Sequence, residues 1–257
     1  IVDNVDGEYF EKIFSQINIK STNFIFISKS GQTFEIKNLL AETLKKIKEK
    51  KIGISTCLYF ITENNSGYLN TFGKKNNIET FHINPNIGGR FSVLSKSSLI
   101  ACEMMNIDWR KIIIGATSAY KKLYLNGFKE INYLSNFYYK HLGKNKTNTG
   151  LISYKNNLDS FGEWFMQLWG ESLGKIRDDG VEMGLTPSRY LGPKDQHSQL
   201  QLILDGPKDK TITFISIKKC ISGNKFLHSS ALKEKNATLS ALQEKKVPYI
   251  ELEIDLL

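Results

Sequence analysis

The chain has 257 residues, of which 40% are hydrophobic and 24% charged, so it can bury a substantial core as one large or two modest domains. No apolar run approaches the roughly 20 residues of a membrane-spanning helix, which argues against an integral membrane protein. The net charge of +9 could attract nucleic acid, an anionic membrane or a phosphorylated metabolite. Lysine carries nearly all of this charge, without an arginine-rich or aromatic-plus-basic face, so nucleic acid is the least supported of the three.

The first half of the chain alternates apolar runs with segments of helical periodicity. We expect a short helix ending near residue 18, strands at 23–28, 54–62 and 79–83, and helices at 33–50 and after Gly67. This alternation implies βαβ crossovers and a parallel sheet.

The second half repeats this alternation after a run of helices. We expect helices at 90–105 and within 109–140, broken near Asn126–Gly127, and then a linker-like stretch at 141–150. The following elements are predicted as a strand at 151–154, a helix at 161–175, a long loop at 176–194, a helix at 196–205, a strand at 211–217, a helix at 225–245 and a strand at 249–254. The two halves could be two copies of one α/β plan.

The three cysteines, Cys57, Cys102 and Cys220, are far apart and lie mostly in apolar runs. This pattern is typical of reduced core thiols in a cytoplasmic protein rather than of disulfides. No two histidines or cysteines stand at metal-ligand spacing, so we predict no metal.

The helix at 161–175 carries a candidate general base. Its apolar side chains form one stripe, and Glu171 lies seven residues after Trp164, at the edge of that stripe. Desolvation beside tryptophan can raise the pKa of a carboxylate toward neutrality, as a general base requires. The alternative is a boundary glutamate whose carboxylate reaches water, and this stretch alone favours the alternative.

The turn Ser28-Lys29-Ser30-Gly31-Gln32-Thr33 stands between a predicted buried strand and a helix. Hydroxyls and free backbone N–H groups at a helix N-terminus suit a phosphate monoester. The alternative is a polar turn in which Thr33 is only an N-cap. No GxGxxG or P-loop pattern is present, so dinucleotides and nucleoside triphosphates are not indicated.

Two further stretches place a cation and a histidine at helix starts. Arg90 follows Gly88–Gly89, where the backbone can approach a ligand and the guanidinium can meet an oxyanion, although a surface arginine in an ordinary turn is equally plausible. His197 lies at a loop-to-helix junction, whereas His82 falls in an apolar strand and is expected in the core.

Together these stretches resemble the glucose-6-phosphate isomerase (phosphoglucose isomerase) family. The matching strings follow the family's order and span almost the whole chain: SKSGQT at 28–33, IGGRFS at 87–92, QLWGESLGK at 167–175 and DQHSQLQLILDGPKDK at 195–210. The resemblance implies an α/β fold of two SIS-type (flavodoxin-like) three-layer αβα domains with mainly parallel sheets. It places the first domain at 1–106 and the second at 107–257.

The resemblance also implies residue roles in a reversible isomerisation of glucose 6-phosphate and fructose 6-phosphate through a cis-enediolate, in glycolysis and gluconeogenesis. No cofactor is implied, and the enzyme would be a cytoplasmic homodimer. Glu171 would shuttle a proton between C1 and C2, Arg90 would stabilise the enediolate, and His197, from the neighbouring subunit, would help open the sugar ring. The phosphate would be held by Ser28, Lys29, Ser30 and Thr33, and Gly89 and Gln167 would also contact the substrate.

The chain departs from the family pattern in two respects. It has no counterpart of the family's Gly-Ile-Gly-Gly-Ser phosphate-binding stretch, nor of the C-terminal helical region that carries a ring-opening lysine. We therefore expect the middle of a longer enzyme, whose first sheet lacks its leading strand and whose second domain lacks the helical region. The alternative function is a non-catalytic SIS-type module that binds sugar phosphate, but such a sensor would need only the phosphate loop.

Overall fold

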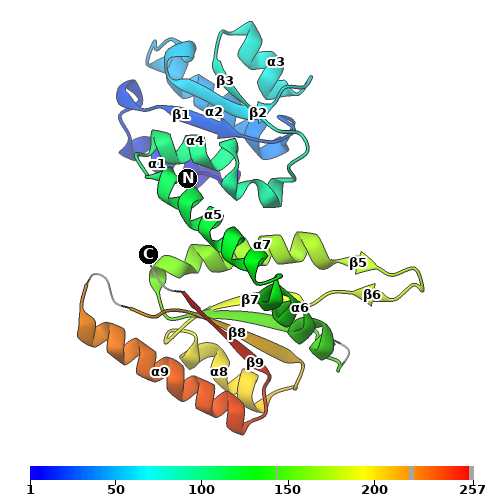
Figure 1. Cartoon of the computed structure of the whole chain (residues 1–257). Coiled ribbons are helices and arrows are strands. Elements are labelled where there is room, and N and C mark those ends of the chain that lie inside the picture. Colours follow the sequence, from blue (N-terminus) through cyan, green and yellow to red (C-terminus); the bar gives the residue numbers. More distant parts are fainter. Residues whose placement is uncertain (143, 220–222, 255–257) are drawn as a thin grey trace. The chain divides into compact units, whose positions relative to one another are not determined.

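The computed structural model describes residues 1–142, 144–219 and 223–254 (Figure 1). The chain divides into two compact units, Ile1–Ile114 and Gly115–Leu257. Each unit is built on its own parallel sheet, so the expected α/β fold with mainly parallel sheets is confirmed.

The first unit contains a sheet of three parallel strands in the order β1-β2-β3. The strands are β1 (Phe24–Ile27), β2 (Leu58–Glu63) and β3 (Glu79–Ile83). The connecting helices are α1 (Gly7–Gln16), α2 (Phe34–Glu49), α3 (Tyr68–Lys75) and α4 (Lys96–Met104), with 3₁₀ turns η1 (Ile19–Ser21), η2 (Ile54–Thr56) and η3 (Gly89–Leu94). Helix α5 (Trp109–Leu125) crosses the boundary to the second unit.

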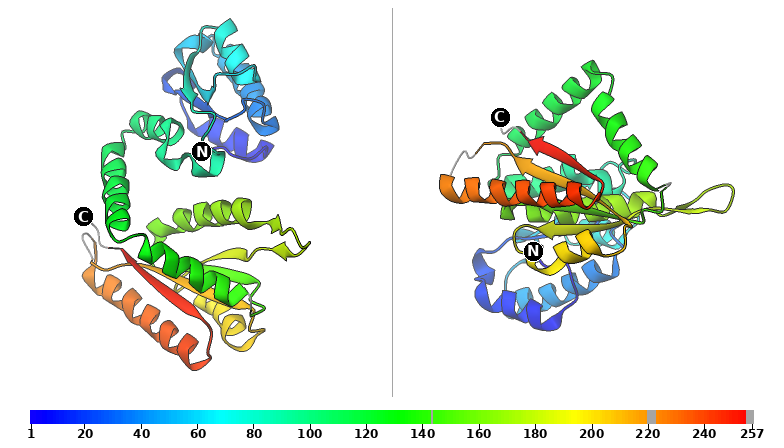
Figure 2. Two further views of the ribbon diagram at one scale, coloured as in Figure 1. Left: turned by 45° about the vertical axis from the view of Figure 1, so that its right-hand side comes forward. Right: turned by 90° about the horizontal axis from the view of Figure 1, so that it is seen from below.

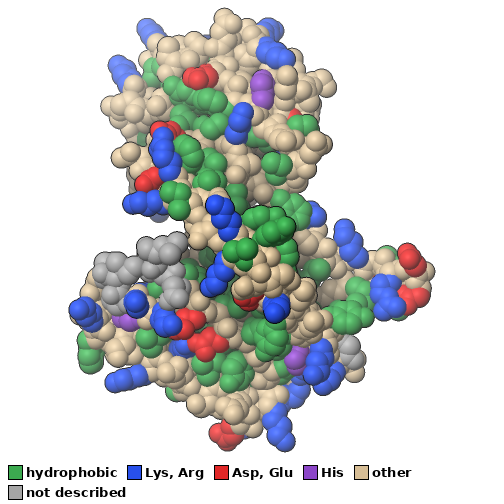
Figure 3. All heavy atoms as spheres, in the orientation of Figure 1, with side chains coloured by type: hydrophobic (Ala, Val, Ile, Leu, Met, Phe, Trp, Pro, Cys, Tyr) green, Lys and Arg blue, Asp and Glu red, His purple; other side chains and the backbone are tan. Residues whose placement is uncertain are grey.

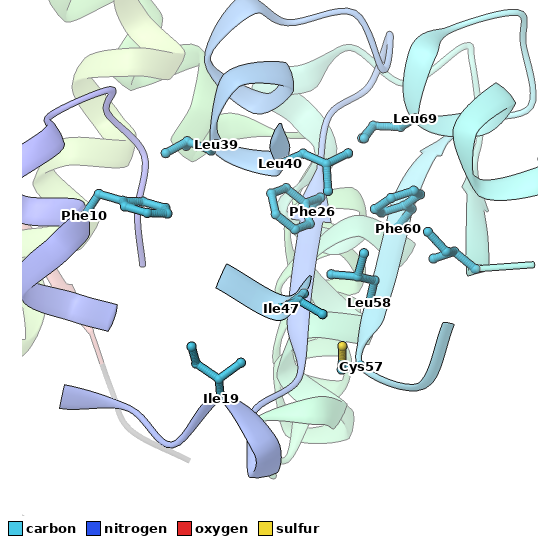
Figure 4. Close-up of a cluster of buried hydrophobic side chains, with 11 residues drawn as sticks. Phe10, Ile19, Phe26, Leu39, Leu40, Ile47, Cys57, Leu58, Phe60 and Leu69 are labelled. Atoms are coloured by element: carbon cyan, nitrogen blue, oxygen red, sulfur yellow. The ribbon is translucent and has the colours of Figure 1, made fainter. Parts of the chain in front are cut away.

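The core of the first unit lies between one face of its sheet and helix α2 (Figure 4). Phe26 of β1 and Phe60 of β2 project from this face, with their rings 6.0 Å apart and nearly perpendicular. Leu40 and Ile47, two turns apart on α2, are fully buried against them. Because side chains alternate along a strand, this packing fixes which strand residues face α2 and holds the strand ends in place.

The second unit contains four parallel strands in the order β7-β4-β8-β9. They are β4 (Asn148–Ser153), β7 (Thr186–Leu191), β8 (Lys210–Ile217) and β9 (Tyr249–Ile254), and a short hairpin pairs β5 (Lys175–Ile176) with β6 (Glu182–Met183). The helical elements are α6 (Lys129–Leu142), η4 (Asn156–Leu158), α7 (Asp159–Leu173), α8 (Gln196–Asp205) and α9 (Lys225–Glu244).

Helices cover both faces of this sheet (Figure 2). On one face, Tyr154 beyond β4 hydrogen-bonds Thr238 of α9 at 2.9 Å, and Ile203 of α8 joins the same core cluster. On the other face, the hydroxyl of Tyr138 on α6 meets that of Thr213 on β8. Alternate residues of β4 and β8 therefore face the two helical layers, as in a three-layer αβα unit.

Several predicted elements match the structure to the residue, namely the strands at 79–83 and 249–254 and the helix at 196–205. The break between α5 and α6 falls at Gly127, whose φ is +60°. The helix predicted at 90–105 is instead η3 followed by α4, separated at Ser95.

The loop predicted at 176–194 is wrong, because it contains the β5–β6 hairpin and the whole of strand β7. β7 is an edge strand bonded only to β4 in the described sheet, so it needs no continuous apolar run. Its Pro187 lacks a backbone donor, which an edge position tolerates. The linker predicted at 141–150 overlaps the end of α6 and the start of β4. The first two residues of β4, Asn148 and the fully buried Thr149, are polar, so the sequence does not show an apolar run where this strand begins.

Candidate active site

The turn between β1 and α2 gathers its hydroxyls as an anion site requires. The Oγ of Ser28, which is buried, lies 2.7 Å from Oγ1 of Thr33 and accepts the N–H of Gly31 at 3.2 Å. The Oγ of Ser30 accepts the N–H of Gln32 at 3.1 Å. Thr33 is the N-cap residue of α2, but its side chain makes no capping hydrogen bond. The alternative in which its hydroxyl caps the helix is therefore wrong.

The turn after β2 braces this loop. The side-chain amide of Asn65 donates to the carbonyl of Ser30 at 3.4 Å, and its oxygen accepts the N–H of Gly67 at 2.8 Å. A Cβ on Gly67 would lie 2.1 Å from that same carbonyl oxygen, so only glycine fits here. The sequence analysis missed this brace, although the Asn64-Asn65-Ser66-Gly67 cluster at the end of a predicted strand was an available signal.

Lys29 lies in the same turn, but its ammonium points along the sheet edge. Nζ donates to the carbonyl of Pro85 at 2.9 Å and lies 3.4 Å from Oε1 of Glu63. The carboxyl ends of the three strands therefore meet here, which is where ligands bind in open α/β sheets.

Arg90 is the second residue of η3, beyond the carboxyl end of β3. Its guanidinium is half-buried and stacks over the ring of Phe91, with 4.7 Å from Cζ to the ring centroid. A Cβ on Gly89 would meet no atom within 4 Å, so that side of the backbone is open to a ligand. The structure thus brings the phosphate turn and the Arg90 loop to one edge of the first unit's sheet.

Glu171 stands near the end of α7, in the second unit. Its Oε1 accepts a 3.0 Å hydrogen bond from the side-chain amide of Gln167, one turn earlier, so these two predicted substrate-contacting residues are neighbours. The carboxylate is exposed, which matches the alternative of a boundary glutamate that reaches water and not the position at a buried edge beside tryptophan. The reason is that α7 packs on the sheet through Gly162, which lies beside Arg189 of β7, and through Trp169, and Glu171 lies roughly 200° around the helix from Trp169.

His197 lies in the first turn of α8, after the carboxyl end of β7. The side chains of its neighbours fix this helix start: Oδ2 of Asp195 accepts the N–H of Leu191 at 2.7 Å, and Nε2 of Gln196 donates to the hydroxyl of Tyr154 at 2.8 Å. His197 itself is exposed. His82 is also exposed, so its predicted place in the core is wrong: it occupies an edge strand, β3, on which only Ile83 is buried.

Glu171 and His197 do not meet within this unit. The indole N–H of Trp169 donates to the carbonyl of Leu185, just before β7 begins, at 2.9 Å. Glu171 therefore lies toward the edge where the strands start, whereas His197 follows the edge where they end. A strand of six residues separates these edges by roughly 20 Å.

The described residues hold no cluster of three or more histidine, cysteine or acidic side chains that could bind a metal ion. Among them, no helix is long and apolar enough to cross a bilayer. Cys57 is a buried free thiol, and burial raises its pKa. Cys102 is a half-buried free thiol, and Cys220 lies outside the described residues.

Positive charge is dispersed on the face drawn in Figure 3. On the face drawn in Figure 3, Lys and Arg side chains occur at many separate places in each unit, among apolar and uncharged side chains. This face therefore shows no basic groove of the kind that binds nucleic acid.

Known proteins resemble this chain over most of its length. A family model described as phosphoglucose isomerase matches residues 1–247. The glucose-6-phosphate isomerase of Campylobacter jejuni is 35% identical over 218 residues, which cover 85% of this chain and 53% of that protein.

Two solved structures resemble the chain. The first is a hypothetical protein from Thermus thermophilus, with a TM-score of 0.85 and 28% identity over 98% of this chain and 65% of that one. The second, a glucose-6-phosphate isomerase from Chlamydia trachomatis, shares the fold, with a TM-score of 0.81 and 20% identity over 98% of this chain and 54% of that one. The chain spans about half the length of the curated relatives it matches. The family match covers nearly every residue, and the chain belongs to the phosphoglucose isomerase family.

Proposed function

We propose that this chain carries the catalytic centre of a glucose-6-phosphate isomerase, which interconverts glucose 6-phosphate and fructose 6-phosphate in glycolysis and gluconeogenesis. The cytoplasm is the compartment that this role implies. The observation that carries the proposal is the turn from Ser28 to Thr33, whose hydroxyls converge at an uncapped helix N-terminus in a member of this family. Such a turn anchors a phosphate monoester without a metal ion.

The remaining site residues supply the chemistry. His197 assists the opening of the sugar ring, which exposes the aldehyde at C1. Glu171 then removes the proton from C2, and the electron pair moves to form the cis-enediolate, whose negative oxygen faces the guanidinium of Arg90. The hydroxyl proton on O2 passes to O1 at the enediolate stage, and return of the carbon-bound proton from Glu171 to C1 leaves the carbonyl at C2 of fructose 6-phosphate, so that protons and electrons balance. Gly89 and Gln167 contact the substrate beside these groups.

The separation of Glu171 and His197 favours a site that is shared between two subunits. Both residues lie in the second unit, at opposite edges of one sheet, so one copy of this unit does not offer both to one sugar. In a symmetric homodimer, His197 of one subunit can complete the site that contains Glu171 of its partner.

Turnover by the purified chain tests the proposal. Fructose 6-phosphate is supplied, and formation of glucose 6-phosphate is followed through a coupled dehydrogenase. Glu171→Gln should abolish turnover and leave sugar-phosphate binding intact, whereas Glu244→Gln, an exposed glutamate in the last turn of α9, should behave as wild type. Binding without turnover in the wild-type chain would indicate a sugar-phosphate-binding module, and undiminished turnover by Glu171→Gln would refute the assigned base.

A further inference from the structure

The side chain of Lys29 crosses the carboxyl edge of the first unit's sheet. Strand β2 lies between β1 and β3, and Lys29 follows β1. Its Nζ lies 3.4 Å from Oε1 of Glu63, the last residue of β2, and donates to the carbonyl of Pro85, beyond β3, at 2.9 Å. One ammonium group therefore joins the ends of all three strands.

The carboxylate that meets Lys29 is itself held in place. The side chain of Glu63 is 17% exposed, and its Oε2 accepts a 3.3 Å hydrogen bond from the side-chain amide of Asn65. The backbone N–H of Glu63 and the hydroxyl of Thr62 both donate to the carbonyl of Lys29, at 3.0 and 3.2 Å. Backbone and side chain of Lys29 are thus bound to the same strand end, which limits the positions that its ammonium can reach.

The segment from Pro85 to Arg90 is a succession of tight turns. The N–H of Asn86 donates to Oδ1 of Asn84 at 2.9 Å, and the N–H of Ile87 donates to the carbonyl of Asn84 at 3.2 Å. The next turn is closed by the N–H of Phe91, which donates to the carbonyl of Gly88 at 3.0 Å. A hydrogen bond that holds Pro85 therefore restrains the turns that carry Arg90.

We propose that Lys29 and Glu63 form a clamp that positions Arg90, and that Lys29 is a positioning residue rather than a ligand of the substrate phosphate. The Lys29 ammonium faces a carboxylate and a carbonyl, so much of its hydrogen-bonding capacity is used at the strand ends. The phosphate is left to the hydroxyls of the turn. This assignment deepens the proposed isomerase function, on which its kinetic part rests.

The clamp predicts a specific kinetic signature. Arg90 acts on the charge of the enediolate, which develops after binding, so misplacing it lowers kcat more than it raises KM. We expect Lys29→Met and Glu63→Gln each to reduce kcat about tenfold, with KM for fructose 6-phosphate within about twofold of wild type. Because both variants break one clamp, the double variant should be no worse than the more impaired single variant.

Amide hydrogen exchange tests the clamp without reference to turnover. In the peptide that spans residues 84–91, both variants should exchange at least about fivefold faster than wild type, because the turns lose their restraint. The matched controls are Lys45→Met and Glu42→Gln, which break an exposed ion pair of 2.7 Å on α2 in the same unit. These controls should leave exchange at 84–91 and the kinetic constants unchanged.

The outcomes separate the competing roles of Lys29. Unchanged exchange at 84–91 in both variants would overturn the clamp. So would a tenfold rise in KM in Lys29→Met at constant kcat, with Glu63→Gln neutral, because that pattern belongs to a direct phosphate ligand. A wild-type chain without turnover would count against the isomerase proposal alone, since the exchange measurement still decides whether the clamp exists.

Discussion

Glu171 and His197 belong to the same unit but lie at opposite edges of its four-stranded sheet. Trp169, two residues before Glu171, hydrogen-bonds the backbone just before β7 begins, whereas His197 follows the end of that strand. Under the proposed function, a substrate at Glu171 therefore needs a histidine from outside this unit. A second copy of the chain supplies it under the proposed function.

Complementation between two inactive variants tests this arrangement. Glu171→Gln and His197→Ala should each abolish or severely reduce turnover alone. When the two are unfolded together and refolded, a mixed dimer has one site with both changes and one with neither. Random pairing should restore about a quarter of wild-type activity. If mixed dimers form, as native mass spectrometry would show, and yet remain inactive, the two residues do not act across a subunit interface.

Gly67→Ala should damage the phosphate turn without removing any group that binds the substrate. The new Cβ would meet the carbonyl oxygen of Ser30 at 2.1 Å and Oδ1 of Asn65 at 2.7 Å, so the turn that holds the hydroxyls must shift. We expect KM for fructose 6-phosphate to rise about tenfold, with a smaller change in kcat. Steady-state kinetics measure both, and Gly7→Ala, whose Cβ would meet nothing within 4 Å, is the matched control.

Alkaline pH should weaken the second unit through Tyr138. Burial raises the pKa of its phenol, and the opposing effect of its hydrogen bond to Thr213 is smaller. A raised folded-state pKa stabilises the fold fully below the ordinary tyrosine pKa of about 10, and this contribution is lost as pH rises from there through the folded-state value. In urea titrations, the free energy of unfolding of wild type should therefore fall more steeply above pH 10 than that of Tyr138→Phe. Equal slopes would contradict this assignment.

Much of the fold could be predicted because buried parallel strands are continuous apolar runs. The clearest case is β8, a central strand with six consecutive buried residues, which was predicted at 211–217 and spans Lys210–Ile217. β7 was missed because an edge strand with Pro187 and a charged Arg189 lacks that signature. Hydrophobic periodicity relates residues within one helix or strand. It does not show which loops of the chain contact each other in the folded protein.

The local geometry of the Ser28–Thr33 turn could be predicted, but the contacts around it could not. The hydroxyls of the Ser28–Thr33 turn converge as the sequence led us to expect. The brace from Asn65 to Ser30 joins residues that lie 35 positions apart, and no local pattern encodes it. The exposure of Glu171 likewise depends on which side of α7 packs on the sheet. The apolar stripe of this helix does not determine which of its residues make that contact.

Under the proposed function, Glu171 carries a proton between C1 and C2 of a sugar phosphate. Proton NMR of fructose 6-phosphate incubated with the chain in D₂O measures this step directly, through the loss of proton signal at C1. We predict that wild type introduces solvent deuterium while it forms glucose 6-phosphate, and that Glu171→Gln slows this exchange by about 10³-fold. Exchange by Glu171→Gln at the wild-type rate would contradict the account.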